Sequence, residues 1–331
     1  MINKKVEALA MTYKVFVSRQ LPDGAIALLR EHFQVEVWPA DSAPSRDQLI
    51  DSVQGCDGLL CMLTDIIDDD FLAACPQLKV VSSMSVGVDH VDIEALNDRQ
   101  ILLGHTPGVL VDTTADLTFS LLLAAARRVP EADQFIRAGK WQQANRWAPD
   151  MFLGKDVAGS TLGIIGLGEI GRAVARRAAA FNMRVISWTR SGRCVEGVDN
   201  VTMDSLLAES DFVSIHVALT EQTRGLIDKR AIGKMKAGAV LVNTARGGIV
   251  DETALAEALR DGRLFSAGLD VFEQEPLQRE SPLLALPNAV FAPHIGSASQ
   301  NTRSKMAAIA AQNLLLGLRG QPMLYCVNKP D

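Results

Sequence analysis

Three segments in the second half of the chain carry side chains that could together polarise a carbonyl group and give it a proton. They are VNTARGGIVDE with Arg246, AGLDVFEQEP with Glu275, and PHIGSAS with His294. A guanidinium binds carboxylate or carbonyl oxygens, an imidazole carries a proton near neutral pH, and a carboxylate stabilises the protonated ring. Each residue alone also fits a structural role, as a turn cap, a loop charge or a core histidine. Their joint placement favours chemistry.

These segments share a position, because each follows a run predicted to be a buried strand. A further segment, SSMSVGVDH (82–90), ends a predicted strand in the first half of the chain. Open α/β sheets bind ligands outside the carboxyl ends of their parallel strands, so this position favours binding and catalysis. Among the other histidines, His90 has no evident task, and we expect His32, His105 and His216 to be structural.

A glycine-rich turn precedes these segments. The six residues of GLGEIG are Gly166, Leu167, Gly168, Glu169, Ile170 and Gly171. The three glycines have the G-x-G-x-x-G spacing, directly after an apolar run and before a strong helix former. That context predicts a dinucleotide site, with the pyrophosphate at the helix N-terminus. An ordinary corner between a strand and a helix is the alternative.

The end of the next predicted strand decides which dinucleotide fits. NAD-binding proteins of this kind place an Asp or Glu there, which bonds the ribose 2′-hydroxyl. This chain has Thr189, followed by Arg190, Ser191 and Arg193. A carboxylate would repel a 2′-phosphate, whereas arginines pair with it and hydroxyls donate to it. The sequence therefore favours NADP(H). In the alternative, the arginines are a solvated surface pair and NAD(H) is also used.

The chain predicts an α/β protein with two doubly wound parallel-sheet domains. Strand-like runs alternate with helices up to residue 105, and a second series of six strands begins at TLGIIG (161–166). We interpret the apolar helix at 109–128 as a spacer between domains, and the helix at 300–318 as packing back on the first domain. The domains predicted are 1–105 with 300–331, which binds substrate, and an inserted NADP-binding Rossmann domain, 106–299.

Composition excludes several classes of partner. The net charge of −6 argues against general affinity for nucleic acid or a membrane, and no run of apolar residues is long enough to cross one. The five cysteines are scattered, and no cluster has the spacing of metal ligands, so we expect neither a disulfide framework nor a metal site. A cytoplasmic location fits best, and the first ten residues are interpreted as an extension or an alternative start.

The motifs together resemble the D-isomer-specific 2-hydroxyacid dehydrogenases over about residues 13–325. The resemblance rests on GIIGLGEIG, VNTARGGIVDE, AGLDVFEQEP and PHIGSAS. Within that family, SVGVDH and NLLLGLRGQPM look most like the glyoxylate/hydroxypyruvate reductases, with the 2-ketogluconate reductases second. It implies a Rossmann domain inserted in a flavodoxin-like substrate domain.

The resemblance also implies roles for single residues. Arg246 would bind substrate and polarise its carbonyl, His294 would donate the proton, and Glu275 would be its partner. Backbone amides around Val86 and Gly87 would hold the substrate carboxylate. Further residues would face the cofactor: Asp270 at the nicotinamide carboxamide, Ala218 and Thr244 along the cleft, and Thr113 or Thr114 from the long helix. Family members are commonly homodimers through the region matching 130–150, where Trp141 or Trp147 would approach the neighbouring site.

The function expected is NADPH-dependent reduction of glyoxylate and hydroxypyruvate, giving glycolate and D-glycerate, with His294 as proton donor. A 2-ketogluconate reductase, another D-2-hydroxyacid dehydrogenase or a phosphite-oxidising relative are the enzyme alternatives. The same fold also serves as a dinucleotide-sensing corepressor, a binding protein without turnover, and fold alone does not separate the two classes.

Overall fold

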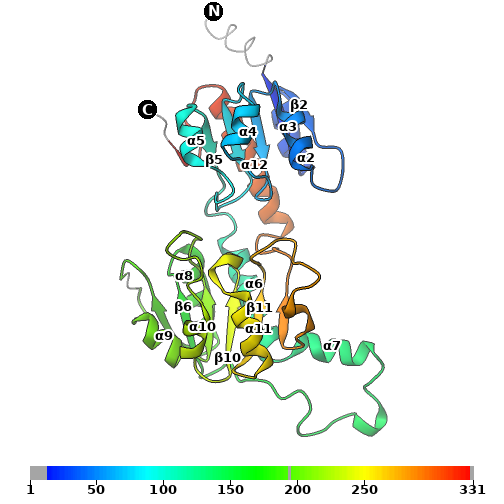
Figure 1. Ribbon diagram of the computed structural model, residues 1–331, viewed down its shortest axis with the longest axis vertical. Helices are drawn as coiled ribbons and strands as arrows, with labels where there is room; N and C mark the ends of the chain where they lie inside the picture. The colour runs from blue at the N-terminus through cyan, green and yellow to red at the C-terminus, as the bar shows by residue number, and fades with distance from the viewer. Residues whose placement is uncertain (1–12, 193–194, 329–331) are drawn as a thin grey trace, which may run out of the picture. The chain divides into compact units, whose positions relative to one another are not determined.

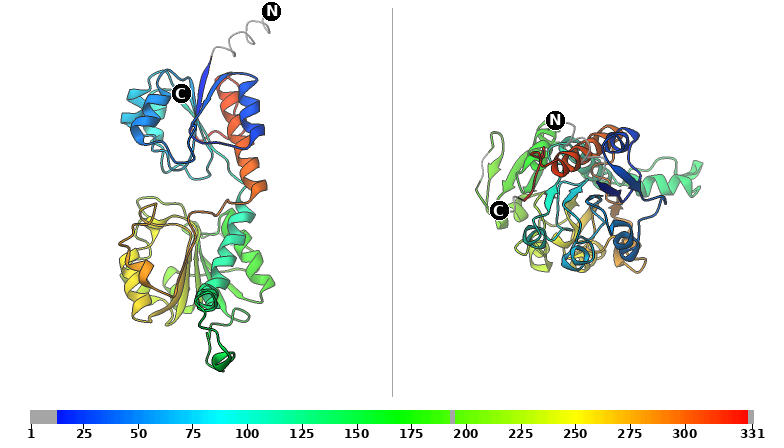
Figure 2. Two further views of the ribbon diagram at one scale, coloured as in Figure 1. Left: turned by 90° about the vertical axis from the view of Figure 1, so that its right-hand side faces the viewer. Right: turned by 90° about the horizontal axis from the view of Figure 1, so that it is seen from above.

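The computed structural model describes residues 13–192 and 195–328, which divide into two units. Unit 1 runs to Leu110 and resumes at Ala298, and unit 2 comprises Val111–Ser297. Each unit is built on one parallel sheet with helices on both faces (Figures 1 and 2). Predicted Arg193 lies outside the described residues. The assignment of substrate to one domain and nucleotide to the other stays a prediction.

Within the described residues, unit 1 has a five-stranded sheet of order β2-β1-β3-β4-β5, the flavodoxin-like order. Its strands are β1 (Lys14–Val17), β2 (Gln34–Val37), β3 (Gly58–Cys61), β4 (Val80–Ser83) and β5 (Leu102–Gly104). Its helices are α2 (Asp23–Arg30), α3 (Arg46–Val53), α4 (Asp69–Ala74), α5 (Ile93–Asp98) and α12 (Gln300–Leu318).

Alternating side chains of β1 show how the two faces of this sheet are filled. Val15 and Val17 pack with α2 and α12, whereas Phe16 packs with α3, α4 and α5 on the other face. Helix α12 comes from the far end of the chain, and its Ala310 carbonyl accepts a hydrogen bond from the buried Ser82 hydroxyl at 2.8 Å. Both faces are covered, so the strands read as nearly continuous apolar runs.

The part of unit 2 that the structure describes has a seven-stranded sheet of order β12-β11-β10-β9-β6-β7-β8. Its strands are β6 (Thr161–Ile165), β7 (Arg184–Trp188), β8 (Asp199–Asn200), β9 (Phe212–Ile215), β10 (Ala239–Asn243), β11 (Leu264–Leu269) and β12 (Ala289–Phe291). The order reverses between β6 and β9, which is the switch point where doubly wound sheets bind nucleotides.

Helices cover both faces of this second sheet. They are α6 (Val111–Ala126), α8 (Glu169–Ala180), α9 (Met203–Glu209), α10 (Lys229–Lys234) and α11 (Glu252–Arg260). Helix α7 (Val129–Arg137) buries no residue and extends away from the sheet (Figure 1). Three short 3₁₀ turns complete the unit: η1 (Gln143–Asn145), η2 (Gly247–Ile249) and η3 (Pro282–Ala285). Helices α6 and α8 share one core with the sheet, and α9, α10 and α11 share the other.

The structure changes two details of the sequence interpretation. The apolar helix predicted as a spacer is α6, which belongs to unit 2 and buries Leu122 and Ala125 in its core. It ends before Arg128, whose φ of 54° is left-handed, and α7 follows as a separate helix. The described sheet also has seven strands where six were predicted, and the additional strand is β8. Its two residues are polar and exposed, so they carry no hydrophobic signal.

Candidate active site

The glycine-rich turn lies between β6 and α8, at the switch point of the sheet. Gly166 has a φ of +97°, and a Cβ there would come within 2.7 Å of the carbonyl oxygen of His216. A Cβ on Gly171 would collide with the carbonyl oxygen of Gly166. Both positions therefore require glycine for the backbone to turn and for α8 to approach β6.

Gly168 differs from its two neighbours, because a Cβ added to it meets no atom within 4 Å. It precedes α8, which begins at Glu169 and has no side-chain cap, whereas Asp251 caps α11 and Ser299 caps α12. The first amides of α8 thus remain for another acceptor, beside open space over Gly168. This arrangement fits a dinucleotide pyrophosphate held by the turn and the helix N-terminus. Leu167 is buried, and Ile170 packs against the same core.

The residues predicted to select the cofactor follow β7 directly. Arg190 is exposed, and its Nη1 donates a hydrogen bond to Oε1 of Gln222 at 2.6 Å. None of the described carboxylates pairs with this guanidinium or neutralises its positive charge. Thr189 is half-buried at the end of β7, and Ser191 is exposed beside Arg190.

Two of the three predicted catalytic side chains are in direct contact. Nδ1 of His294 lies 2.7 Å from Oε2 of Glu275, and the second carboxylate oxygen accepts the Phe272 N–H at 3.0 Å. Burial opposes ionisation of Glu275, but the hydrogen bond and charge of His294 hold the pKa of the carboxyl below its ordinary value. An ionised Glu275 accepts the proton on Nδ1, which leaves Nε2 as the nitrogen that can exchange a proton with a ligand.

Arg246 lies at the start of η2, just after β10. Its backbone oxygen accepts from Nδ2 of Asn243 at 2.9 Å, and its Nη1 donates to the carbonyl of Ala245 at 2.8 Å. A Cβ on Gly247 would collide with the carbonyl group of Phe272, so the Arg246 turn packs directly on the segment that carries Glu275. The charge of Arg246 further lowers the pKa of Glu275. The three predicted catalytic residues thus lie in one region of unit 2.

Asp270 holds the turn that carries His294. His294 has a left-handed φ of 52°, an arrangement that costs a residue with a side chain about 1 kcal/mol or more. Its N–H donates to the Asp270 carbonyl at 2.8 Å. The Asp270 carboxylate accepts the N–H groups of Ile295 and Gly296 at 2.7 and 2.8 Å. The strained turn is therefore fixed from one buried residue.

Thr114 and Thr118 of α6, and Thr244 directly after β10, are linked to this turn by hydrogen bonds. Thr114 donates to the Gly296 carbonyl at 3.2 Å, and Thr118 donates to the Thr114 carbonyl at 2.8 Å. The Thr118 and Thr244 hydroxyls are 2.8 Å apart, so Thr244 must be the donor to Thr118. Predicted Ala218 is exposed after β9, where its carbonyl accepts from the Thr223 hydroxyl.

The predicted carboxylate-binding residues, Val86 and Gly87, belong to unit 1. They are half-buried in the loop that follows β4. The N–H groups of both residues donate to no acceptor in the described part of the chain. The loop can therefore offer backbone donors to an anion.

Comparisons with known proteins agree with this geometry. The family model described as D-isomer specific 2-hydroxyacid dehydrogenase, NAD binding domain, matches residues 119–296, more than half of the chain. A glyoxylate reductase from Korarchaeum cryptofilum (strain OPF8) is 48% identical over 96% of this chain and 97% of its own length. The chain belongs to the D-isomer specific 2-hydroxyacid dehydrogenase family. It is an oxidoreductase, which confirms the enzyme class predicted from the sequence.

Solved structures confirm the predicted fold of this dehydrogenase. A protein from Thermus thermophilus has a TM-score of 0.90 at 47% identity, covering 95% of this chain and 100% of that one. An NADPH-dependent glyoxylate/hydroxypyruvate reductase from Sinorhizobium meliloti, in complex with NADP and malonate, has a TM-score of 0.85 at 30% identity, covering 95% of this chain and 96% of that one.

Two residues of the dehydrogenase that contact predicted site residues were missed from the sequence. Thr118 lies one helical turn after Thr114, so the i, i+4 spacing could have placed both on one face of α6. Gln222 lies 32 positions after Arg190. No local pattern joins them, because the loops after β7 and β9 meet only in the folded sheet.

Burial raises the pKa of Asp270 to about 6, although the amides of Ile295 and Gly296 and the charge of His294 favour its ionised form. Above that pH both carboxylate oxygens accept backbone N–H groups. Below it one oxygen carries a proton and the turn is held less firmly. We expect kcat/KM of the dehydrogenase to fall as the pH drops below about 6.

The matched variant is Asp270→Asn, which cannot ionise. We expect its kcat/KM to be lower by about tenfold at neutral pH, because one backbone N–H loses its acceptor. Its acid limb near pH 6 should disappear. Steady-state rates from pH 5 to pH 8 measure both effects, and an acid limb that persists unchanged in the variant would assign it to another group.

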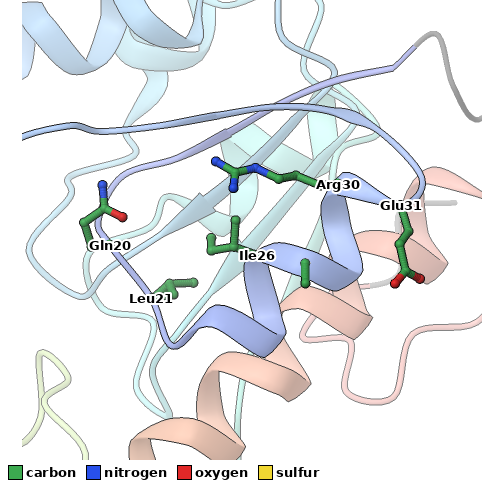
Figure 3. Close-up of a pocket in the computed structure, with 6 residues that line it drawn as sticks. Gln20, Leu21, Ile26, Arg30 and Glu31 are labelled. Atoms are coloured by element: carbon green, nitrogen blue, oxygen red, sulfur yellow. The ribbon is translucent and has the colours of Figure 1, made fainter.

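A hollow along α2 in unit 1 is not a candidate site (Figure 3). Its lining is Gln20, Leu21, Ile26, Ala27, Arg30 and Glu31, which include none of the predicted residues. In the described part of the chain, no group of three or more His, Cys, Asp or Glu side chains could hold a metal ion. The helices there also include none long and apolar enough to cross a membrane.

Proposed function

We propose that this dehydrogenase reduces glyoxylate to glycolate with NADPH, and hydroxypyruvate to D-glycerate in the same way. The observation that carries the proposal is the 2.7 Å pair of His294 and Glu275 beside the Arg246 turn. His294 can donate a proton to the carbonyl oxygen of a 2-oxo acid, and the guanidinium of Arg246 can bind that oxygen. The name of the Korarchaeum relative, a glyoxylate reductase, supports the choice of substrate.

Reduction of the carbonyl needs a hydride at carbon and a proton at oxygen. The glycine-rich turn and the N-terminus of α8 would hold the reduced dinucleotide, which would supply the hydride. Arg246 binds the carbonyl oxygen and stabilises the negative charge that develops on it. Nε2 of His294 gives that oxygen its proton, and Glu275 stabilises the charged ring beforehand through Nδ1. The amides of Val86 and Gly87 bind the substrate carboxylate.

The preference for NADPH rests on the residues after β7. Thr189 stands where a carboxylate would repel a 2′-phosphate, and Arg190 carries a charge that no described carboxylate neutralises. Gln222 holds the guanidinium through one nitrogen, which leaves its other donors for phosphate oxygens. The Sinorhizobium relative is named as NADPH-dependent, which agrees with this preference.

Replacing Arg190 by alanine is expected to raise KM for NADPH by about 10–100-fold, because the variant loses a charged hydrogen bond to the 2′-phosphate. KM for NADH should change by less than about threefold, because NADH carries no 2′-phosphate. Arg184→Ala is the matched control, since Arg184 is an exposed arginine of β7 that pairs with Glu209 and Asp199. Equal weakening of both cofactors by Arg190→Ala would remove this arginine from the 2′-phosphate.

We also propose that the protein forms a homodimer, and that the segment from α7 to Leu153 contacts the second copy. This segment extends away from the sheet of unit 2 (Figure 1). This segment exposes Ile136, Trp141 and Leu153, and Trp147 is 78% exposed. An apolar group of this kind on one segment is typical of an interface.

The proposed interface is tested by replacing one of its apolar side chains with a charge. Ile136→Asp should convert a dimer to a monomer in sedimentation velocity. The control Leu284→Asp, an exposed leucine of η3, should stay dimeric. A dimer that survives Ile136→Asp contradicts this placement.

The proposed function is tested by initial rates with NADPH and NADH, each with glyoxylate, hydroxypyruvate, pyruvate and 2-ketogluconate. We expect the largest kcat/KM for glyoxylate or hydroxypyruvate with NADPH. A larger value for 2-ketogluconate would make the chain a reductase of sugar acids, and a preference for NADH would contradict the cofactor assignment.

A further inference from the structure

A buried polar network lies behind the loop that follows β4 in unit 1. Ser83, Ser85 and His90 are 0%, 3% and 8% exposed. The Ser83 hydroxyl lies 2.7 Å from that of Ser85 and 3.0 Å from Nε2 of His90. The Ser85 hydroxyl in turn donates to the carbonyl of Gly87 at 2.7 Å. Hydroxyls buried this way are held by their partners, so the direction of each bond can be worked out.

Counting protons gives the network one direction. Ser85 has a single hydroxyl proton and gives it to the Gly87 carbonyl, so it must accept from Ser83. Ser83 has then used its own proton and must accept from Nε2 of His90. His90 therefore carries a proton on Nε2. The chain of donors runs from His90 through Ser83 and Ser85 to the backbone at Gly87.

Two further residues hold the preceding carbonyl groups of the same loop. Nδ1 of His105 lies 3.1 Å from the carbonyl oxygen of Val86, which can only accept, so His105 carries a proton on Nδ1. The Ser85 carbonyl accepts from both the N–H and the hydroxyl of Thr106, at 2.8 and 3.0 Å. The carbonyl groups of Ser85, Val86 and Gly87 are thus each fixed by a donor from the protein.

Fixing a carbonyl also fixes the N–H on the other side of its peptide. The peptides after Ser85, Val86 and Gly87 are trans, so each N–H points opposite to the carbonyl that the protein holds. The N–H groups concerned belong to Val86, Gly87 and Val88, and none of them finds an acceptor within residues 13–192 and 195–328. Consecutive backbone N–H groups left open in this way form a site for an anion.

We infer that Ser85 and His105 are positioning residues that aim these amides at the substrate carboxylate, with Ser83 and His90 holding the Ser85 hydroxyl in place. The inference rests on the proposed function, in which Val86 and Gly87 bind that carboxylate. A lone serine could turn its hydroxyl away from the Gly87 carbonyl. With the Ser83 proton directed at it, the Ser85 oxygen is occupied as an acceptor, and its own proton is left for the backbone.

The test compares an acid with its ester, because only the acid presents a carboxylate to the loop. Glyoxylate and ethyl glyoxylate share the reacting aldehyde. In Ser85→Ala and in His105→Leu we expect KM for glyoxylate to rise about tenfold, the loss of roughly one well-aimed hydrogen bond to a charged group. The value of kcat/KM for ethyl glyoxylate and the Kd of NADPH should stay within about twofold of wild type.

Conservative variants separate positioning from folding. His105→Asn retains a donor where Nδ1 stands and should return KM for glyoxylate to within about threefold of wild type. His90→Gln, which keeps a donor at the Nε2 position, should likewise bind glyoxylate better than His90→Leu. Ser82→Ala is the matched control, because it removes a buried serine hydroxyl on the same strand that bonds Ala310 instead of the loop.

The outcomes are distinct from those of the proposed function. Wild-type turnover of glyoxylate tests the proposed function by itself. If another 2-oxo acid is the substrate, the same ratios are measured with that acid and its ester. Unchanged KM in Ser85→Ala and His105→Leu, or equal losses for acid and ester, overturns the inference and leaves these residues only structural.

Discussion

Replacing His294 by alanine is expected to lower kcat about a thousandfold, within the range of 10²–10⁴ typical for loss of a general acid. The Nε2 proton has no substitute in the described site, because Glu275 is held ionised by its partners. The Kd of NADPH should change by less than about threefold, since the glycine-rich turn is built from β6 and α8. Single-turnover rates with glyoxylate, together with titration of cofactor fluorescence, measure the two quantities.

The control for this variant is His32→Ala. His32 is also half-buried, but it lies after α2 in unit 1, where Nδ1 contacts Arg319 at 2.9 Å. Its loss should leave kcat within about twofold. A His294→Ala enzyme that retains wild-type kcat would remove His294 from the mechanism, and a large loss of NADPH binding would give it a structural role instead.

Replacing Arg246 by alanine is expected to lower kcat/KM for glyoxylate by about 10²–10³-fold, with both a higher KM and a lower kcat. The guanidinium binds the carbonyl oxygen in the ground state and more strongly as charge develops on it, so both constants change. Because Arg246 also stabilises the ionised Glu275, its loss further weakens the acid pair.

Arg246→Lys is the informative companion. Lysine keeps the charge but lacks the planar pair of donors, so it should recover part of the affinity and little of kcat. Steady-state kinetics with glyoxylate measures the split between kcat and KM. If Arg246→Ala changes KM alone, the residue binds substrate without polarising it, and the proposed mechanism is wrong on that point.

The grouping of the three proposed catalytic side chains could be predicted because they follow buried strands. Arg246, Glu275 and His294 stand after β10, β11 and β12, and parallel strands bring such ends to one edge of a sheet. The sequence could not show that Asp270 fixes the left-handed turn at His294. Asp270 follows β11, whereas the N–H groups that it accepts, those of Ile295 and Gly296, follow β12. The contact of Arg190 with Gln222 was missed for the same reason.

The fold shows the same division between strong and weak patterns. The apolar run at 161–166 predicted β6 within one residue, and the helix predicted at 300–318 is α12 at its observed bounds. Strand β8 is short, polar and exposed, so only its pairing with β7 reveals it. Helix α7 buries no residue and had no core pattern to find.

The most direct measurement is glyoxylate-dependent oxidation of NADPH carrying deuterium at both C4 positions, with the glycolate product analysed by mass spectrometry. The proposed function predicts rapid oxidation and one deuterium on carbon in each glycolate, because the hydride comes from the cofactor and the proton on oxygen from His294. Glycolate without deuterium, or no oxidation of NADPH by glyoxylate, would contradict it.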